Sequence, residues 1–247
     1  MSYEIEKHYN KIASAYDKLE SYNPRKHILI SKIFTDVVGD VCGLSVLDLG
    51  CGSGFFSRLA KKQGAKFVLG IDISEKQLHF ARKKSKKAGL KIVYEKGDAF
   101  NIQVKELFDI VIAGFTLSYA GRKSILQQAL DNIYKHLKPG SKLFAVVSNP
   151  TNPLRDQKII YRVSASINKN LVDGSKLRCE FYDKEGRLLC YDYKFFWSKK
   201  TFNTLLRKAR FKNIRWVEIK SKNENSQNVP KLRSTNIVLC AEKPRKA

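Results

Sequence analysis

Acidic residues and a run of alternating glycines stand at positions where they could together hold a ligand with cationic and hydroxyl groups. The run Val46–Gly54 reads VLDLGCGSG, in which an apolar stretch reaches the carboxylate of Asp48 and continues into a glycine at every second position. Glycine lets the backbone turn tightly and approach a ligand closely. Two further carboxylates, Asp72 and Asp98, follow the next two apolar stretches. The pattern predicts a binding site for a ligand that contains a ribose.

Two kinds of ligand compete for this pattern. Asp72 suits the ribose hydroxyls of a dinucleotide or of another nucleoside. The glycines follow G-x-G-x-G, whereas dinucleotide sites use G-x-G-x-x-G. Asp48 would repel a pyrophosphate, and Asp98 adds a third carboxylate. Three acids at the ends of three strands suit an ammonium group, a ribose and an adenine amine, and S-adenosylmethionine carries all three without a phosphate.

The elements that must position these residues alternate along the first 150 residues. Short apolar strands separated by amphipathic helices predict an α/β fold with a parallel sheet covered on both faces. Two helices are expected first, over 3–20 and after Pro24. The expected strands are 45–49, 67–71, 91–95, 109–113 and 142–147, and the helices between them are near 54–63, 75–88 and 123–138.

The pattern changes after Pro150. Strands at 177–182 and 188–195 are joined by a predicted hairpin turn over 183–186, and a helix at 199–209 precedes strands at 214–219 and 234–241. We interpret residues 1–247 as a single domain with a helical cap (1–40), a ligand-binding core (44–148) and a substrate-side elaboration with the last strands (150–247).

Five stretches of residues 44–148 together resemble the class I S-adenosylmethionine-dependent methyltransferases. They are VLDLGCGSG, GIDIS (70–74), GDA (97–99), FDIVIAGFTL (108–117) and LKPGSKLF (137–144). The resemblance implies a Rossmann-like sheet of seven strands in the order 3-2-1-4-5-7-6, with an antiparallel final pair. It also implies an enzyme that uses S-adenosylmethionine.

The resemblance further assigns expected roles to individual residues. Asp48 and the glycine loop would hold the methionine end, Asp72 the ribose hydroxyls, and Asp98 the adenine amine. Ile73 would flank the adenine, and Ala99 would contribute backbone contacts. The expected cofactor-binding set is Tyr16, Arg25, Asp48, Gly50, Cys51, Gly52, Gly54, Asp72, Ile73, Asp98, Ala99, Ala113 and Phe115.

The N-terminal helix narrows the resemblance. Residues 9–17 resemble the opening of small-molecule methyltransferases of the toxoflavin and ubiquinone-biosynthesis types, in which the second tyrosine, here Tyr16, covers the cofactor. A tyrosine that packs into the core is the alternative for Tyr16. Arg25 is the last residue of a further stretch, Tyr22–Arg25, that resembles the toxoflavin type. It either pairs with the cofactor carboxylate or lies at the surface.

Methyl transfer to a small acceptor needs alignment more than acid–base chemistry, because the sulfonium methyl is already a good electrophile. A base helps only if the acceptor loses a proton. His8, His27 and Tyr16 are weak candidates for such a role. Alternating aromatic residues over 177–197 form either one wall of a pocket for a heteroaromatic nitrogen or oxygen acceptor, or part of the core.

The charge of the chain leaves a second function open. Lys and Arg number 47 against 23 Asp and Glu, a net charge of +24. A solvated basic surface explains this, but so would an acidic or phosphorylated ligand, or RNA as the substrate of an RNA-modifying methyltransferase. A non-catalytic protein that retains the fold is disfavoured by the intact glycine loop.

The five cysteines are expected to be free thiols without a metal, and the absence of a membrane span or secretion signal favours the cytoplasm.

Overall fold

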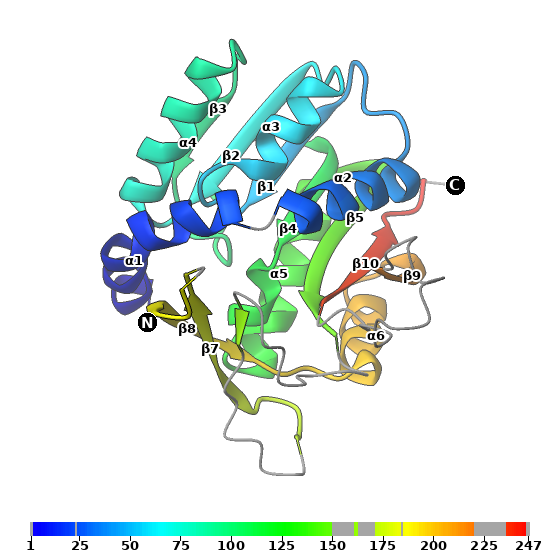
Figure 1. The fold of residues 1–247 in the computed structure, drawn as a ribbon. Coiled ribbons are helices and arrows are strands. Elements are labelled where there is room, and N and C mark those ends of the chain that lie inside the picture. Colours follow the sequence, from blue (N-terminus) through cyan, green and yellow to red (C-terminus); the bar gives the residue numbers. More distant parts are fainter. Residues whose placement is uncertain are drawn as a thin grey trace, which may run out of the picture.

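A seven-stranded sheet runs through the computed structural model, which describes residues 2–22, 24–149, 161–162, 171–183, 185–219 and 236–245 (Figure 1). The strand order is β3-β2-β1-β4-β5-β10-β9. The strands are β1 (Ser45–Leu49), β2 (Phe67–Asp72), β3 (Val93–Lys96), β4 (Phe108–Gly114), β5 (Leu137–Ser148), β9 (Lys212–Glu218) and β10 (Asn236–Glu242). The first five are parallel, and β10 is antiparallel to both β5 and β9. The expected fold class, strand order and antiparallel final pair are therefore confirmed.

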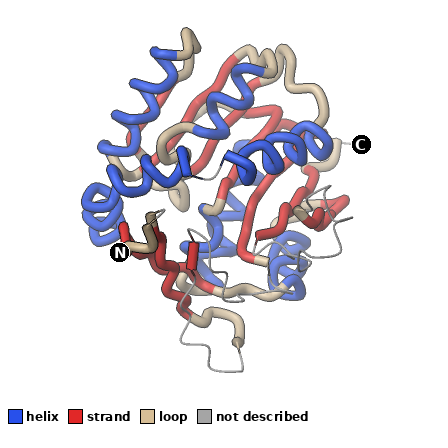
Figure 2. The backbone as a smooth tube through the Cα atoms, viewed as in Figure 1, coloured by secondary structure: helices blue, strands red, loops and turns tan. Residues whose placement is uncertain are grey.

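Alternation along the central strands builds a core on each face of the sheet. In β1, Val46 packs with one set of buried residues, while Leu47 and Leu49 pack with the other, because successive side chains of a strand point to opposite faces. The helices α2 (Pro24–Val38) and α3 (Phe55–Lys62) contribute to the first core, and α5 (Lys123–His136) and α6 (Lys199–Lys208) contribute to the second. Figure 2 shows the helices lying over the sheet.

A smaller assembly stands at the carboxyl end of the parallel strands. It contains α1 (Ser2–Tyr22) and a second, antiparallel sheet of β6 (Tyr161–Arg162), β7 (Lys176–Tyr182) and β8 (Leu188–Phe195). Strand β8 contacts both α1 and η1 (Thr116–Tyr119), a short 3-10 helix that follows β4. The predicted hairpin turn is present, and the Asp183 N–H donates to Arg187 O at 2.9 Å.

The remaining helix, α4 (Glu75–Lys87), begins at the end of β2 and leads back toward the start of β3. Ser74 caps it, because the Ser74 hydroxyl accepts a hydrogen bond from the Gln77 N–H at 3.2 Å. None of the helices in the described ranges is long and apolar enough to cross a bilayer. The same ranges contain no group of three histidine, cysteine or acidic side chains that could hold a metal ion.

Candidate functional site

Three glycines follow β1, and two of them are required by the packing of the protein itself. Gly50 has φ +61°, and a Cβ there would lie 2.5 Å from Oγ1 of Thr116, whose hydroxyl donates to Leu49 O at 2.6 Å. Gly54 has φ +82°, and a Cβ there would collide with the Tyr94 hydroxyl. Side chains at either position would therefore be strained and would also displace packed neighbours.

Gly52 differs because the space beside it is open. Its φ is +53°, and the nearest atom to an added Cβ would be Gln77 Oε1, at 3.9 Å. Its N–H donates to Asp72 Oδ2 at 2.8 Å. The loop thus presents bare backbone toward unfilled space, and a ligand can approach here more closely than any side chain would allow.

Asp72, at the end of β2, holds this loop in place. Its second oxygen, Oδ1, accepts the Ser74 N–H at 2.9 Å, so the carboxylate joins the glycine loop to the start of α4. Burial raises the pKa of Asp72 to about 6, although the amide hydrogen bonds act in the opposite direction. The Ser74 hydroxyl also donates to Asn10 Oδ1 at 2.7 Å, which ties α1 to the same corner.

Asp48 lies behind the loop with one oxygen unsatisfied. Its Oδ2 accepts the Ser57 hydroxyl at 2.6 Å, whereas Oδ1 is buried without a hydrogen-bond partner in the part of the chain that the structure describes. Burial raises the pKa of Asp48 to about 7; the hydrogen bonds of Ser57 lower it, and the negative charge of Asp72 raises it further. A buried, unsatisfied carboxylate oxygen favours a cationic or hydrogen-bond-donating ligand group nearby.

The third carboxylate follows β3, the outermost parallel strand. Gly97 N–H donates to Asp72 O at 3.0 Å, which joins the ends of β2 and β3, and Asp98 comes next. Asp98 Oδ1 accepts the Phe100 N–H at 2.9 Å. Asp48, Asp72 and Asp98 thus stand at the carboxyl ends of three adjacent strands. Three expected cofactor-binding residues are half-buried: Ile73, Asp98 and Ala99. Cys51, in the glycine loop, is buried, and its burial raises the pKa of the thiol well above its usual range.

The end of β4 forms the other side of the site. The order of the strands reverses between β1 and β4, and ligands of open α/β sheets bind at such a reversal. Ala113 is fully buried, and Phe115 takes the left-handed conformation with φ +71°, its N–H donating to Val146 O at 2.8 Å. This conformation is rare for residues other than glycine, and such strain tends to occur at functional sites.

A buried cluster of three tyrosines and one carboxylate, which we name the Asp192 cluster (Tyr9, Tyr16, Tyr119 and Asp192), connects α1, η1 and β8. Asp192 Oδ2 accepts the Tyr9 hydroxyl at 2.8 Å and the Tyr119 hydroxyl, and Oδ1 accepts the Tyr193 N–H at 2.7 Å. Burial, followed by the charge of Asp192, raises the pKa of all three tyrosines well above the usual value. All three tyrosines therefore stay protonated, and Tyr9 and Tyr119 donate to Asp192.

The weak catalytic candidates fall in or beside this cluster where the structure describes them. The Tyr16 ring packs edge-on against Phe181, with the ring centroids 5.1 Å apart. His8 Nε2 lies 3.1 Å from Tyr191 O and 3.9 Å from Asp192 Oδ1. Arg25 and His27 belong to α2, but their side chains lie outside the described residues.

Two aromatic residues of β8, Tyr191 and Tyr193, lie neither in the core nor on the inward face of the hairpin. Tyr191 and Tyr193 point outward and are 39% and 38% exposed, with Arg178 and Lys176 lying over their rings. The inward face of β8 carries Cys190, Asp192 and Lys194 instead. The strict alternation of aromatic and charged residues over 191–194 indicates two unlike faces, but the charged face is the one that turns inward.

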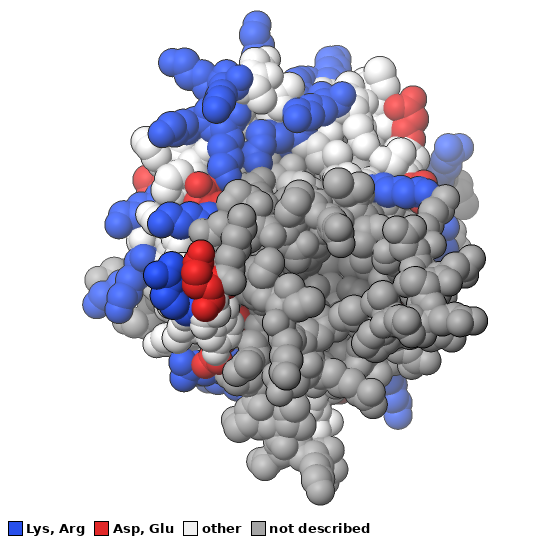
Figure 3. All heavy atoms as spheres, viewed as in Figure 1, with Lys and Arg blue, Asp and Glu red and all other residues white. Residues whose placement is uncertain are grey.

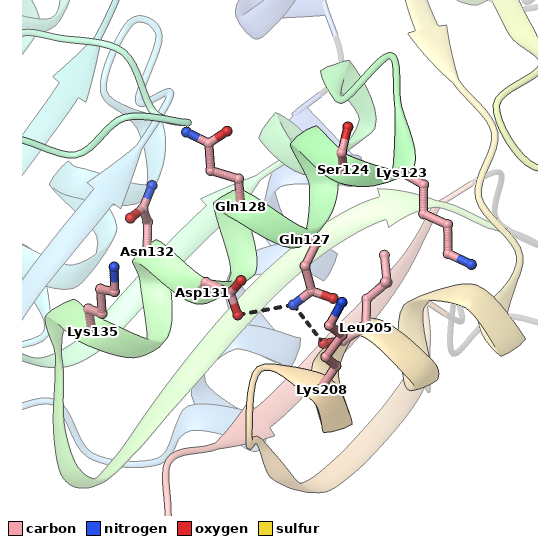
Figure 4. Close-up of a pocket in the computed structure, with 9 residues that line it drawn as sticks. All are labelled: Lys123, Ser124, Gln127, Gln128, Asp131, Asn132, Lys135, Leu205 and Lys208. Atoms are coloured by element: carbon pink, nitrogen blue, oxygen red, sulfur yellow. Dashed lines mark hydrogen bonds between the residues drawn. The ribbon is translucent and has the colours of Figure 1, made fainter.

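A pocket elsewhere on the surface is separate from this site. It lies along α5 and α6, where Gln127 Nε2 donates to Asp131 Oδ1 at 3.0 Å and to Leu205 O at 3.3 Å (Figure 4). None of its lining residues is among the predicted site residues. It is therefore not the predicted cofactor site.

Comparison with known proteins finds methyltransferases, in agreement with the three carboxylates at the strand ends. Residues 46–140 match the methyltransferase domain family. The demethylmenaquinone methyltransferase of Lactococcus lactis is 32% identical over 159 residues, and the malonyl-[acyl-carrier protein] O-methyltransferase of Bacillus cereus is 21% identical over 183 residues. The matched regions cover 62% and 73% of this chain, and 62% and 65% of these two relatives. The two relatives are named for different acceptors, so the likeness concerns the shared domain.

A solved structure extends the likeness over nearly the whole chain. An S-adenosylmethionine-dependent methyltransferase from Clostridium acetobutylicum superposes with a TM-score of 0.66 at 18% identity, covering 96% of this chain and 99% of that one. The shared fold therefore includes the region outside residues 46–140.

Proposed function

We propose that the chain, whose residues 46–140 match the methyltransferase domain family, transfers the methyl group of S-adenosylmethionine to a nitrogen or oxygen of a small heteroaromatic metabolite. The relative from Lactococcus lactis is named for a quinone-type acceptor, which supports a small acceptor here. The rings of Phe115 and Tyr119, at the end of β4, suit a flat one.

One observation carries the proposal: carboxylates stand at the ends of three adjacent strands, and the loop after the first of these strands is open at Gly52. In this arrangement Asp72 would accept hydrogen bonds from ribose hydroxyls, and Asp98 from the adenine amine. Asp48, with its unsatisfied Oδ1, would face the cationic methionine end. A pyrophosphate would meet two buried carboxylates here, whereas a cationic ligand without a phosphate is stabilised by them. The residues present therefore fit S-adenosylmethionine.

The chain itself supplies alignment and exclusion of water. When bound, S-adenosylmethionine supplies an activated methyl group, and holding an acceptor atom about 3–3.5 Å from it can account for several kcal/mol of rate enhancement. The Asp192 cluster fixes α1 and β8 next to η1, at the point where the strand order reverses. The tyrosines of this cluster are kept protonated, so they position groups and do not remove protons.

An RNA-modifying methyltransferase is the second candidate, because basic residues gather over the surface above α3 and α4 (Figure 3). They include Lys62 at the end of α3 and Lys86 and Lys87 at the end of α4. These helix ends precede β2 and β3, so they lie at the amino ends of the parallel strands. The cofactor site is at the opposite edge. This separation favours the small acceptor.

The two candidates are separated by following the methyl group. The protein is incubated with S-adenosylmethionine labelled in its methyl group and an extract of its source organism, which is then divided into RNA and metabolite fractions. We expect the label in the metabolite fraction. Label in RNA would support the second candidate, and label in neither fraction would contradict both.

A further inference from the structure

Lys194 is a buried lysine that has no counter-charge among the described residues. It lies on the inward face of β8 and is 4% exposed. Its ammonium nitrogen lies 5.1 Å from the centre of the Phe115 ring and 6.0 Å from that of Tyr119. Within the described part of the chain, no hydrogen-bond acceptor or carboxylate pairs with this ammonium. Burial of a charge is costly unless the charge is paired, so this arrangement requires an explanation.

The nearest carboxylate on the same strand face does not supply the pairing. Asp192 already accepts the hydroxyls of Tyr9 and Tyr119 and the Tyr193 N–H. These bonds direct its two oxygens toward α1 and η1 and toward its own backbone. The strand therefore presents a satisfied anion and, two residues further on, a cation that no described residue pairs.

The position of Lys194 relates it to the predicted methyl-transfer site. Phe115, the ring beside its ammonium, is the strained residue directly after β4. The next residue, Thr116, donates to Leu49 O and lies against Gly50, the first glycine of the cofactor loop. Lys194 is therefore separated from this loop by the single turn that carries Phe115 and Thr116.

We propose that Lys194 binds an anionic oxygen group, a carboxylate or a phosphate, on the methyl acceptor. The ammonium of lysine is a compact point charge suited to both groups, and the Phe115 ring would cover the acceptor beside it. The proposal rests on the proposed function and deepens it, because it restricts the acceptor to acidic molecules. It also gives a role to one positive charge that lies inside the protein, apart from the basic surface over α3 and α4.

The first experiment sorts acceptors by charge. A metabolite extract of the source organism is separated on an anion-exchange resin, and each fraction is incubated with the protein and methyl-labelled cofactor. We expect methyl transfer with the retained, anionic fraction. Loss of transfer after phosphatase treatment of that fraction would identify the group as a phosphate, and persistence would identify a carboxylate. Transfer only with the unretained fraction would overturn the role of Lys194 while leaving the proposed function intact.

The second experiment changes the charge. In Lys194→Met, kcat/KM with the retained fraction should fall at least tenfold, mainly through KM, while Lys194→Arg keeps most of the activity. The matched control is Lys176→Met, which removes an exposed lysine from the outward face of the same sheet. Equal kinetics of Lys194→Met and this control would overturn the proposal.

If no fraction supports methyl transfer, the proposed function itself is contradicted. A measurement of thermal stability then still tests the role of Lys194. Removal of an unpaired buried cation should raise the Tm of the ligand-free protein, by about 2–4 °C for a chain of this size. A Tm below that of Lys176→Met would show that Lys194 stabilises the fold, and would overturn its assignment as a binding residue.

Discussion

The substitution Asp192→Asn should release α1 from the rest of the protein. Asp192 receives three hydrogen bonds, from the Tyr9 and Tyr119 hydroxyls and from the Tyr193 N–H. Hydrogen bonds to a charged group contribute about 1.5–3 kcal/mol each, and those between neutral groups about 0.5–1.5 kcal/mol. The neutral amide keeps the shape of the carboxylate but weakens each bond by about 1 kcal/mol. Only the bond from Tyr9 joins α1 to Asp192, so the attachment of α1 loses about 1 kcal/mol.

This loss should appear first as local opening, because the described contacts of α1 are mainly with α4 and with the small second sheet rather than with the central strands. They include the hydrogen bond from Ser74 to Asn10. A change of about 1 kcal/mol corresponds to an opening equilibrium about 5 times more favourable. The central strands, which have no part in the cluster, should keep their protection.

Amide hydrogen exchange measured by mass spectrometry resolves the two regions. In Asp192→Asn, peptides from α1 should exchange about fivefold faster than in the wild type, while peptides from β1 and β4 stay unchanged. The control is Tyr193→Phe, which alters an outward-facing residue of the same strand. If α1 exchanges at the same rate in both variants, the carboxylate does not hold this helix and the reasoning is wrong.

The remaining predictions concern the glycine loop and the carboxylates around it. Gly54→Ala should unfold about 10 °C lower in a thermal scan, because left-handed strain and the collision with Tyr94 together cost about 3 kcal/mol; an unchanged Tm would contradict this packing. The raised pKa of Asp72 means that the folded ligand-free protein binds more protons than the unfolded chain between about pH 4 and 6. Its contribution to stability therefore falls as pH rises through this window, by at most about 1.4 kcal/mol per unit. In urea unfolding at several pH values, the free energy of unfolding of Asp72→Asn relative to that of the wild type should rise with pH up to about pH 6 and stay constant above it.

Local pattern sufficed for the central strands of the main sheet, because β1, β2 and β4 are buried on both faces. The alternation of Val46 and Leu47 and the break at Pro24 are both visible in the sequence, and the structure places β1 and α2 accordingly. The expected strand at 142–147 is longer in the structure, since β5 begins at Leu137. The composition of residues Lys138 to Ser141 predicts a turn. In the structure their backbone extends β5, and Gly140 N–H donates to Lys243 O just beyond the end of β10.

The inner face of β8 could not be assigned from the strand alone. Aromatic and charged residues alternate there, and hydrophobicity favours the aromatic side as the buried one. Asp192 is buried because Tyr9 and Tyr119, distant in sequence, donate to it. Only the tertiary fold brings these partners together. For the same reason the tie between Asn10 and Ser74 and the strain at Phe115 could not be predicted.

The central claim is that the open side of Gly52 receives S-adenosylmethionine, and calorimetry with this cofactor tests it directly. We expect the wild type to bind one molecule per chain, and Gly52→Ala and Asp72→Ala to bind at least tenfold more weakly. Gly89→Ala is the matched control, since Gly89 also has a positive φ (+66°) and no atom within 4 Å of an added Cβ, but lies after α4 at the far edge of the sheet. A wild-type protein that does not bind the cofactor, or a Gly52→Ala variant that binds it as well as Gly89→Ala does, would contradict the account.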